Sequence, residues 1–135
     1  MEVLHPQMTE LDGYTIPVFS VNECPDDEFS WQKASKRLNC SSDSSLKYRY
    51  HCVSNTQRTS LVEFCYDATR PLVQKGNCME LAQSTTLNQY ACNQSFRFGC
   101  PQTYYYSDVS FKYPFCTLIE TSKKCYIAES GCLVQ

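Results

Sequence analysis

Ten cysteines are the residues of this chain most suited to chemistry, and their spacing limits what that chemistry is. No two are close enough to form the C-x₂₋₄-C pair of structural zinc sites, and the same spacing argues against a thioredoxin-type redox pair. Their even number and regular spread are typical of a disulfide framework. We therefore predict five disulfides, and neither a metal nor another cofactor, with the bridges formed among Cys24, Cys40, Cys52, Cys65, Cys78, Cys92, Cys100, Cys116, Cys125 and Cys132.

The sequence leaves the pairing of these cysteines open, because ten cysteines can be connected in many ways. A disulfide that closes a loop of about 15 residues stabilises a fold by about 3 kcal/mol in the chain-entropy model. Several such bridges rival the whole net stability of a small domain, about 5–15 kcal/mol. We therefore expect that the reduced chain does not fold and that the protein matures in an oxidising, extracellular environment.

Histidine is scarce, and only His51 lies within the cysteine frame, since His5 precedes it. A hydrolase could use His51 as the general base for a serine nucleophile, with an aspartate to orient the ring. No G-x-S-x-G motif accompanies it, and it adjoins Cys52. We interpret His51 as structural and assign no catalytic residue, with a hydrolase centred on His51 as the alternative.

The acidic side chains have simpler interpretations than catalysis. Asp26 and Asp27 fall where a helix is expected to begin, and Glu63 and Glu80 stand where they would complete helix-capping boxes. A glycosidase needs two facing carboxylates, one with a raised pKa. The expected helix-start and capping roles account for these four carboxylates without catalysis. The chain also lacks the D-x-D-x-D-G pattern of a calcium loop and a glycine-rich phosphate loop.

Aromatic residues near the C-terminal third form the best candidate for a binding surface. Tyrosine offers a large contact area and a polar tip at a low cost in entropy. Three adjacent side chains cannot all point into a core, so at least one of three consecutive tyrosines should face outward. The alternative is that a small core recruits these rings for itself. The candidate binding residues are Tyr104, Tyr105, Tyr106, Phe111 and Tyr113.

Charge and hydropathy narrow the partners and the location. Twelve basic and 14 acidic residues give a net charge of −2, so no bulk field attracts nucleic acid or anionic lipid. No apolar run is long enough to span a membrane, and the N-terminal stretch lacks the basic and apolar regions of a signal peptide. Together with the disulfides, this predicts a fragment of a longer secreted or membrane-anchored protein. The N-x-S/T pattern adds two candidate glycosylation sites, Asn39 and Asn93, of which Asn39 is the weaker because a cysteine follows it.

The local patterns predict one cysteine-rich domain over residues 24–135, preceded by a tail or linker over residues 1–23 that holds one short strand at Tyr14–Val21. The clearest element is a helix from about Pro25 to Asn39, with acidic residues in its first turn and basic residues in its last. Trp31, Ala34 and Leu38 give this helix one apolar stripe. The cysteines that flank it could attach both of its ends to the rest of the domain.

Two further helices are predicted, at residues 60–66 and from Asn77, each from a capping-box pattern. Alternating apolar residues would also fit a strand at 60–66. Short strands are expected at 46–52 and 103–106, and a helical turn after residue 107 that Pro114 ends. The sum is a small disulfide-rich α+β domain that leans toward helix, with about three short helices and short strands.

Short motifs follow one another along the cysteine frame and cover residues 24–132. They are WQKASKRLNC at 31–40, YHC at 50–52, LVEFC at 61–65, GNCMEL at 76–81, LN at 87–88, GCP at 99–101, YPFC at 113–116 and KCY at 124–126. In order and spacing they resemble a cysteine-rich module that recurs in predicted secreted and cell-surface proteins of bivalve molluscs. The resemblance implies an ectodomain, often within a longer chain that carries a membrane span. It implies no catalytic residue.

These observations predict a non-enzymatic extracellular recognition module that binds a protein or a glycan. One alternative is a small secreted hydrolase centred on His51, which a pocket around His51 with a serine or aspartate in reach would favour. The other is a structural matrix protein, which a fold with neither such a pocket nor an exposed aromatic patch would favour. An exposed patch around residues 104–106 would favour the recognition module.

Overall fold

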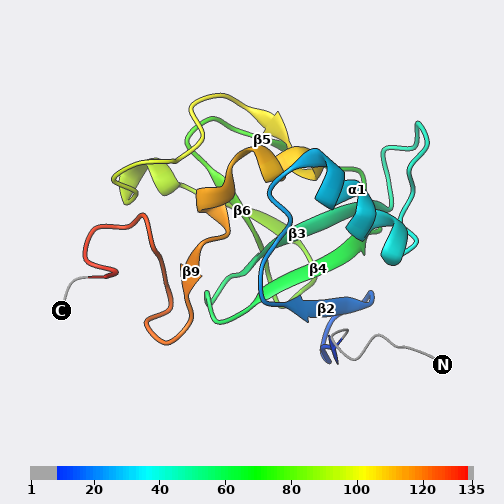
Figure 1. Cartoon of the computed structure of the whole chain (residues 1–135), viewed down its shortest axis with the longest axis horizontal. Helices are drawn as coiled ribbons and strands as arrows, with labels where there is room; N and C mark the ends of the chain where they lie inside the picture. Colours follow the sequence, from blue (N-terminus) through cyan, green and yellow to red (C-terminus); the bar gives the residue numbers. More distant parts are fainter. Residues whose placement is uncertain (1–8, 134–135) are drawn as a thin grey trace.

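A computed structural model describes residues 9–133, and its main element is a six-stranded sheet (Figure 1). The strand order is β1-β2-β4-β3-β6-β7, and neighbouring strands are antiparallel except for the parallel pair of β3 and β6. The strands of this sheet are β1 (Thr9–Glu10), β2 (Val18–Val21), β3 (Arg49–Asn55), β4 (Leu61–Tyr66), β6 (Cys78–Leu81) and β7 (Leu87–Tyr90).

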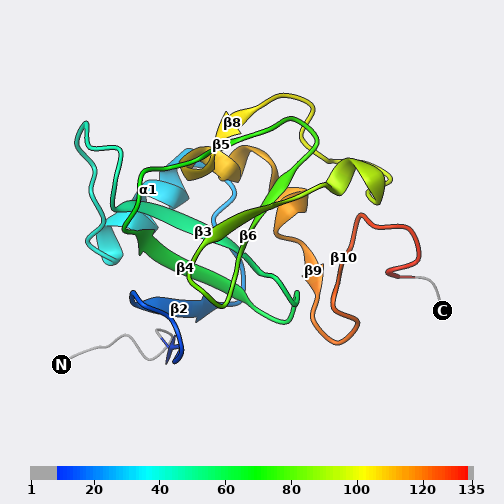
Figure 2. The same cartoon turned by 180° about the vertical axis from the view of Figure 1, so that it is seen from behind.

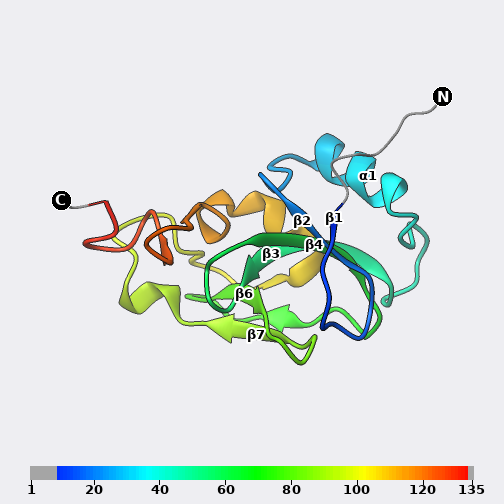
Figure 3. The ribbon, with the colours of Figure 1, turned by 90° about the horizontal axis from the view of Figure 1, so that it is seen from below.

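Shorter elements surround the sheet. Helix α1 (Glu28–Arg37) and the 3₁₀ helix η2 (Ser107–Lys112) lie on the same side of it, and the C-terminal segment lies at the end of the molecule remote from α1 (Figures 1 and 2). Seen from below, α1 and β7 are on opposite sides of the molecule (Figure 3). The remaining elements are two ribbons, β5 (Leu72–Val73) with β8 (Tyr105–Tyr106) and β9 (Ile119–Glu120) with β10 (Cys125–Tyr126), and two 3₁₀ turns, η1 (Cys92–Gln94) and η3 (Pro114–Cys116).

The prediction of a helix-leaning domain with three helices is wrong. Strands dominate, and α1 is the single α-helix in residues 9–133. The segments expected to be the second and third helices are the strands β4 and β6. At 60–66 the structure thus has the strand that was the alternative. All six residues of β4 are buried because this strand lies between two others and is covered on both faces, so burial on one face could not separate the two possibilities.

Helix α1 confirms the prediction of a helix in this region, with a later start. It begins at Glu28 rather than near Pro25, because Asp27 is the N-cap and its Oδ1 accepts a 2.7 Å hydrogen bond from the backbone N–H of Ser30. Trp31 and Ala34 are buried as the apolar stripe requires. The Trp31 ring meets that of Tyr50 of β3 edge-on, with centroids 4.8 Å apart.

All ten cysteines are paired, which confirms the predicted disulfide framework. Two bridges attach α1 at both ends: Cys24, before the helix, bonds Cys52 of β3, and Cys40, after it, bonds Cys65 of β4. Of the remaining three bridges, Cys92–Cys100 and Cys125–Cys132 close short loops, and Cys78–Cys116 joins residues 38 apart in the sequence.

The core lies mainly between the sheet and the segments that pack on it. Val18 of β2 is fully buried there, together with Phe64 of β4 and Leu81 of β6. In the segment expected to be a tail or linker, β2 lies within the predicted short strand, and β1 adds a second strand to the same sheet. Within residues 9–133, no helix has the length and apolar character that crossing a membrane requires.

Candidate functional site

His51 is held by two hydrogen bonds in the centre of the fold. Its Nδ1 lies 2.9 Å from the carbonyl oxygen of Arg49, and its Nε2 lies 2.6 Å from Oγ of Ser107, at the start of η2. Because a carbonyl oxygen can only accept, Nδ1 carries the ring proton and donates it. Nε2 then accepts from the Ser107 hydroxyl, which is the arrangement of a serine with its general base.

Burial keeps this imidazole neutral. His51 and Ser107 are both 0% exposed, and desolvation lowers the pKa of His51 to about 4. The hydrogen bond to the Arg49 carbonyl and the nearby carboxylate of Asp108 act in the opposite direction and do not overcome the effect of burial. The ring also stacks on Phe64 at a centroid distance of 5.7 Å.

The His51–Ser107 pair therefore has the hydrogen bond of a hydrolytic dyad without access for a substrate. A nucleophile must come within bonding distance of a substrate carbon, and the Ser107 hydroxyl is enclosed by the core. The pair connects η2 to β3. The sequence singled out His51 but not Ser107, because nothing local indicates a contact across 56 residues.

Asp108 does not orient the His51 ring but pairs with two arginines. Its Oδ2 lies 3.2 Å from Nε of Arg49, and its Oδ1 lies 3.1 Å from a terminal guanidinium nitrogen of Arg70. Asp108 is 5% exposed, whereas both arginines reach the surface. The Arg70 guanidinium also lies over the ring of Tyr106, 4.0 Å from its centroid.

The three consecutive tyrosines alternate between the surface and the core. Tyr104 and Tyr106 are 64% and 45% exposed, whereas Tyr105 is 6% exposed and packs on Tyr113 with ring centroids 4.5 Å apart. Leu72 lies directly opposite Tyr106 in the β5–β8 ribbon and is also exposed. We refer to Arg70, Leu72, Tyr104 and Tyr106 as the β5–β8 patch.

The other two aromatic candidates serve packing more than the surface. Phe111 is half-buried against Trp31, with ring centroids 5.3 Å apart. Tyr113 is half-buried against Tyr105. The structure thus divides the predicted binding residues into two exposed tyrosines and three rings that support the core.

Both candidate glycosylation sites are at the surface. Asn39 follows α1 in the left-handed backbone region, with φ of 61°, and is exposed. Asn93 lies in η1, is also exposed, and packs its side chain close to Gly76. Their exposure is compatible with an attached glycan.

The surface of the described residues has hollows that the sequence did not indicate. A cleft of about 490 Å³ separates residues 20–26 from residues 114–121, and Glu23 and Asp26 are among its lining residues. A smaller cavity of about 170 Å³ lies beside α1 and is lined in part by Arg70 and Phe111. Arg70 therefore belongs both to this cavity and to the β5–β8 patch.

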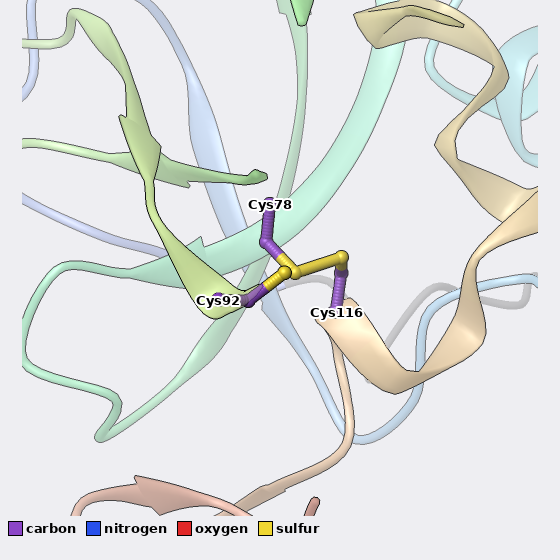
Figure 4. A group of neighbouring side chains, drawn as sticks. All are labelled: Cys78, Cys92 and Cys116. Atoms are coloured by element: carbon purple, nitrogen blue, oxygen red, sulfur yellow. A yellow bond between two sulfur atoms is a disulfide. The ribbon is translucent and has the colours of Figure 1, made fainter. Parts of the chain in front are cut away.

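Three sulfur atoms gather in one place. The Sγ atoms of Cys78, Cys92 and Cys116 all lie within 4.8 Å of one another. Figure 4 shows the three side chains pointing toward one another. Three thiolates at this spacing would suit a soft metal ion, but each of these sulfurs is in a disulfide and offers no thiolate.

Comparison with models of protein families, with curated proteins and with solved structures finds no match for this chain.

Proposed function

We propose that this chain is a non-enzymatic extracellular recognition domain that binds a partner protein through the β5–β8 patch. The observation that carries the proposal is the pair of exposed tyrosine rings, Tyr104 and Tyr106, of which Tyr106 lies opposite Leu72 and under the Arg70 guanidinium. Tyrosine and arginine are enriched among the residues that dominate the energy of protein interfaces.

The geometry of the patch supports this role. Tyr106 is fixed by its pairing with Leu72 and by the Arg70 guanidinium over its ring, so little side-chain freedom would be lost on binding. Arg70 is fixed in turn by Asp108. The neighbouring cavity of about 170 Å³, which Arg70 also lines, offers a place for a side chain of the partner.

The disulfides support an extracellular location. Five bridges in a chain of 135 residues are typical of secreted domains and ectodomains, and unusual in a reducing compartment. The resemblance to extracellular modules of bivalves points the same way. The enclosed His51–Ser107 pair supports a binding role over the alternative of a hydrolase.

The proposal is tested by comparing binding by the folded chain and by its Tyr104→Ser variant. The immobilised proteins are exposed to extracellular fluid of the source organism, retained proteins are identified by mass spectrometry, and each is purified and titrated against both. We expect at least a tenfold weaker affinity for the variant, which corresponds to about 1.4 kcal/mol. The same two proteins are also tested on a glycan array.

A matched control is Phe29→Ser, because Phe29 is 75% exposed on α1, outside the patch. This variant should bind the partner as the unmodified chain does. Equal affinities for all three proteins would contradict the assignment of the patch. Binding to glycans that depends on Tyr104, without a protein partner, would contradict a protein as the ligand. If the unmodified chain binds nothing in either assay, the result would contradict a recognition role and favour the matrix role.

A further inference from the structure

The disulfides Cys78–Cys116 and Cys92–Cys100 lie next to each other in space, although they join different segments of the chain. Cys78–Cys116 links β6 to η3, and Cys92–Cys100 closes a loop of its own. The sulfur of Cys92 lies within 4.8 Å of both sulfurs of the other bridge (Figure 4). A thiolate at that position would have a disulfide as its nearest reaction partner.

The four sulfurs differ in their access to solvent. Cys78 and Cys92 are 0% exposed and Cys116 is 3% exposed, whereas Cys100 is half-buried. Of the four residues, only Cys100 has appreciable exposed surface, so a dissolved thiol has its best approach there, and the Cys78–Cys116 bridge is shielded from it. Thiol–disulfide exchange depends on such access as well as on the thiolate itself.

We infer that the two bridges form an exchange relay, which a dissolved monothiol enters at Cys100 and which ends at the Cys78–Cys116 bridge. The external thiolate attacks Sγ of Cys100, forms a mixed disulfide there and expels Cys92 as a thiolate. The Cys92 thiolate then attacks one sulfur of Cys78–Cys116, forms a new bridge to it and expels the other cysteine as a thiolate. Each step breaks one S–S bond and forms one, so the second step needs no further oxidant or reductant.

The relay would change how the C-terminal part of the chain is covalently attached to the sheet. Cys78–Cys116 is the one disulfide between the sheet and residues 101–133, because Cys125–Cys132 is internal to that segment and Cys92–Cys100 ends at its border. When Cys92 bonds to Cys78, Cys116 becomes free and this attachment is lost. When Cys92 bonds to Cys116, the segment is attached through η1 instead of β6.

The test is the Cys100→Ser variant, in which Cys92 has no partner from the start. The folded monomer is isolated and then unfolded in denaturant that contains N-ethylmaleimide at mildly acidic pH, where few thiolates remain to exchange. The buried thiols are alkylated in this way before the bridges are mapped by peptide mass spectrometry. We expect the free thiol at Cys78 or Cys116 in part of the molecules, together with a new bridge to Cys92. A thiol found at Cys92 alone, with Cys78–Cys116 intact throughout, would overturn the inference.

A matched control and a second measurement keep the result clear. Cys132→Ser frees Cys125, which belongs to no such sulfur cluster in residues 9–133, so its thiol should stay at Cys125. If Cys100→Ser does not fold, the unmodified protein is treated with limiting glutathione and mapped in the same way. We expect the first adduct at Cys100, followed by bridges to Cys92 from Cys78 or Cys116. Native pairing of Cys78 with Cys116 in every adduct would refute the relay.

Discussion

The hydroxyl of Ser107 donates to Nε2 of His51 across 2.6 Å, and both side chains are fully enclosed by the core. The same hydrogen bond at the surface would prepare a serine for attack on a substrate. Here it satisfies two polar groups that would otherwise be buried without a partner. Its effect is to join the 3₁₀ helix η2 to the central strand β3, which places Asp108 and the β5–β8 patch relative to the sheet.

We expect His51→Ala to lower the free energy of unfolding by about 2–4 kcal/mol, because it opens a cavity and leaves the Ser107 hydroxyl unpaired. Urea unfolding followed by tryptophan fluorescence measures this change. Ester, RNA and glycan substrates should show no hydrolysis by either protein. A hydrolytic activity present in the unmodified chain and lost in His51→Ala would contradict the non-enzymatic assignment.

Stability should fall as the pH is lowered from about 6.5 to about 4. The pKa of His51 is about 4 in the folded chain and near 6.5 when the ring is exposed, so between these values the unfolded chain binds a proton that the folded chain does not. The full difference is about 3 kcal/mol. Glu80 acts in the opposite direction, since burial raises its pKa and its protonation favours the folded state.

Comparison of the unmodified chain with His51→Gln isolates this effect, because glutamine does not titrate and Glu80 is present in both proteins. Urea unfolding near neutral pH and near pH 4 should show a larger loss of stability for the unmodified chain. Equal losses in the two proteins would mean that His51 is not buried as a neutral ring.

The sequence was sufficient for the cysteine framework and for α1, whose signals are local. It misled at Glu63 and Glu80, which look like members of capping boxes but are buried on strands and pair with arginines far along the chain. Arg37 bonds Glu63 and Arg58 bonds Glu80, over 26 and 22 residues. A six-residue buried segment carries too few periods to separate a strand from a helix, so only these nonlocal contacts decide.

The candidate site divides in the same way. Alternation along three consecutive tyrosines requires that at least one ring faces outward, and Tyr104 and Tyr106 do. The rest of the patch was not predictable from the sequence. Leu72 is placed there by its strand pairing with Tyr106, and Arg70 is placed there by its ion pair with Asp108. The contact of Ser107 with His51 likewise depends on how η2 folds back over β3.

The pair of Arg37 and Glu63 should be important for stability. Two hydrogen bonds of 2.7 and 3.0 Å join the guanidinium to the carboxylate, which is 1% exposed and also accepts from the Tyr50 hydroxyl. Arg37→Ala should lower the free energy of unfolding by about 3 kcal/mol, because it leaves a buried carboxylate without its counter-ion.

Lys36→Ala is the matched control for this prediction. Lys36 lies in the same last turn of α1 but is exposed, so its removal should change stability by less than about 0.5 kcal/mol. Chemical denaturation of both variants under the same conditions measures the difference. Equal effects would show that the α1–β4 ion pair does not form in solution.

Glycan attachment is expected at Asn93 and, less completely, at Asn39 when the chain is secreted from a eukaryotic cell. Both side chains are exposed, but at Asn39 the intervening Cys40 is bonded to Cys65. Treatment with peptide-N-glycosidase in ¹⁸O-labelled water should mark Asn93 in more molecules than Asn39. A secreted protein that carries no glycan at Asn93 would contradict this expectation.

Tyr104→Ser and Tyr105→Ser should have opposite consequences although the residues are adjacent. Tyr104 is 64% exposed, so its replacement should change the free energy of unfolding by less than about 0.5 kcal/mol. Tyr105 packs on Tyr113, and its hydroxyl donates a 3.0 Å hydrogen bond to the carbonyl of Asn77, so its loss should cost about 3–4 kcal/mol. Thermal and urea unfolding measure the stability of both variants.

If Tyr104→Ser is as destabilising as Tyr105→Ser, then the Tyr104 ring belongs to the core and cannot contact a partner. If only Tyr105→Ser is destabilising, weaker binding by Tyr104→Ser reports on the surface alone.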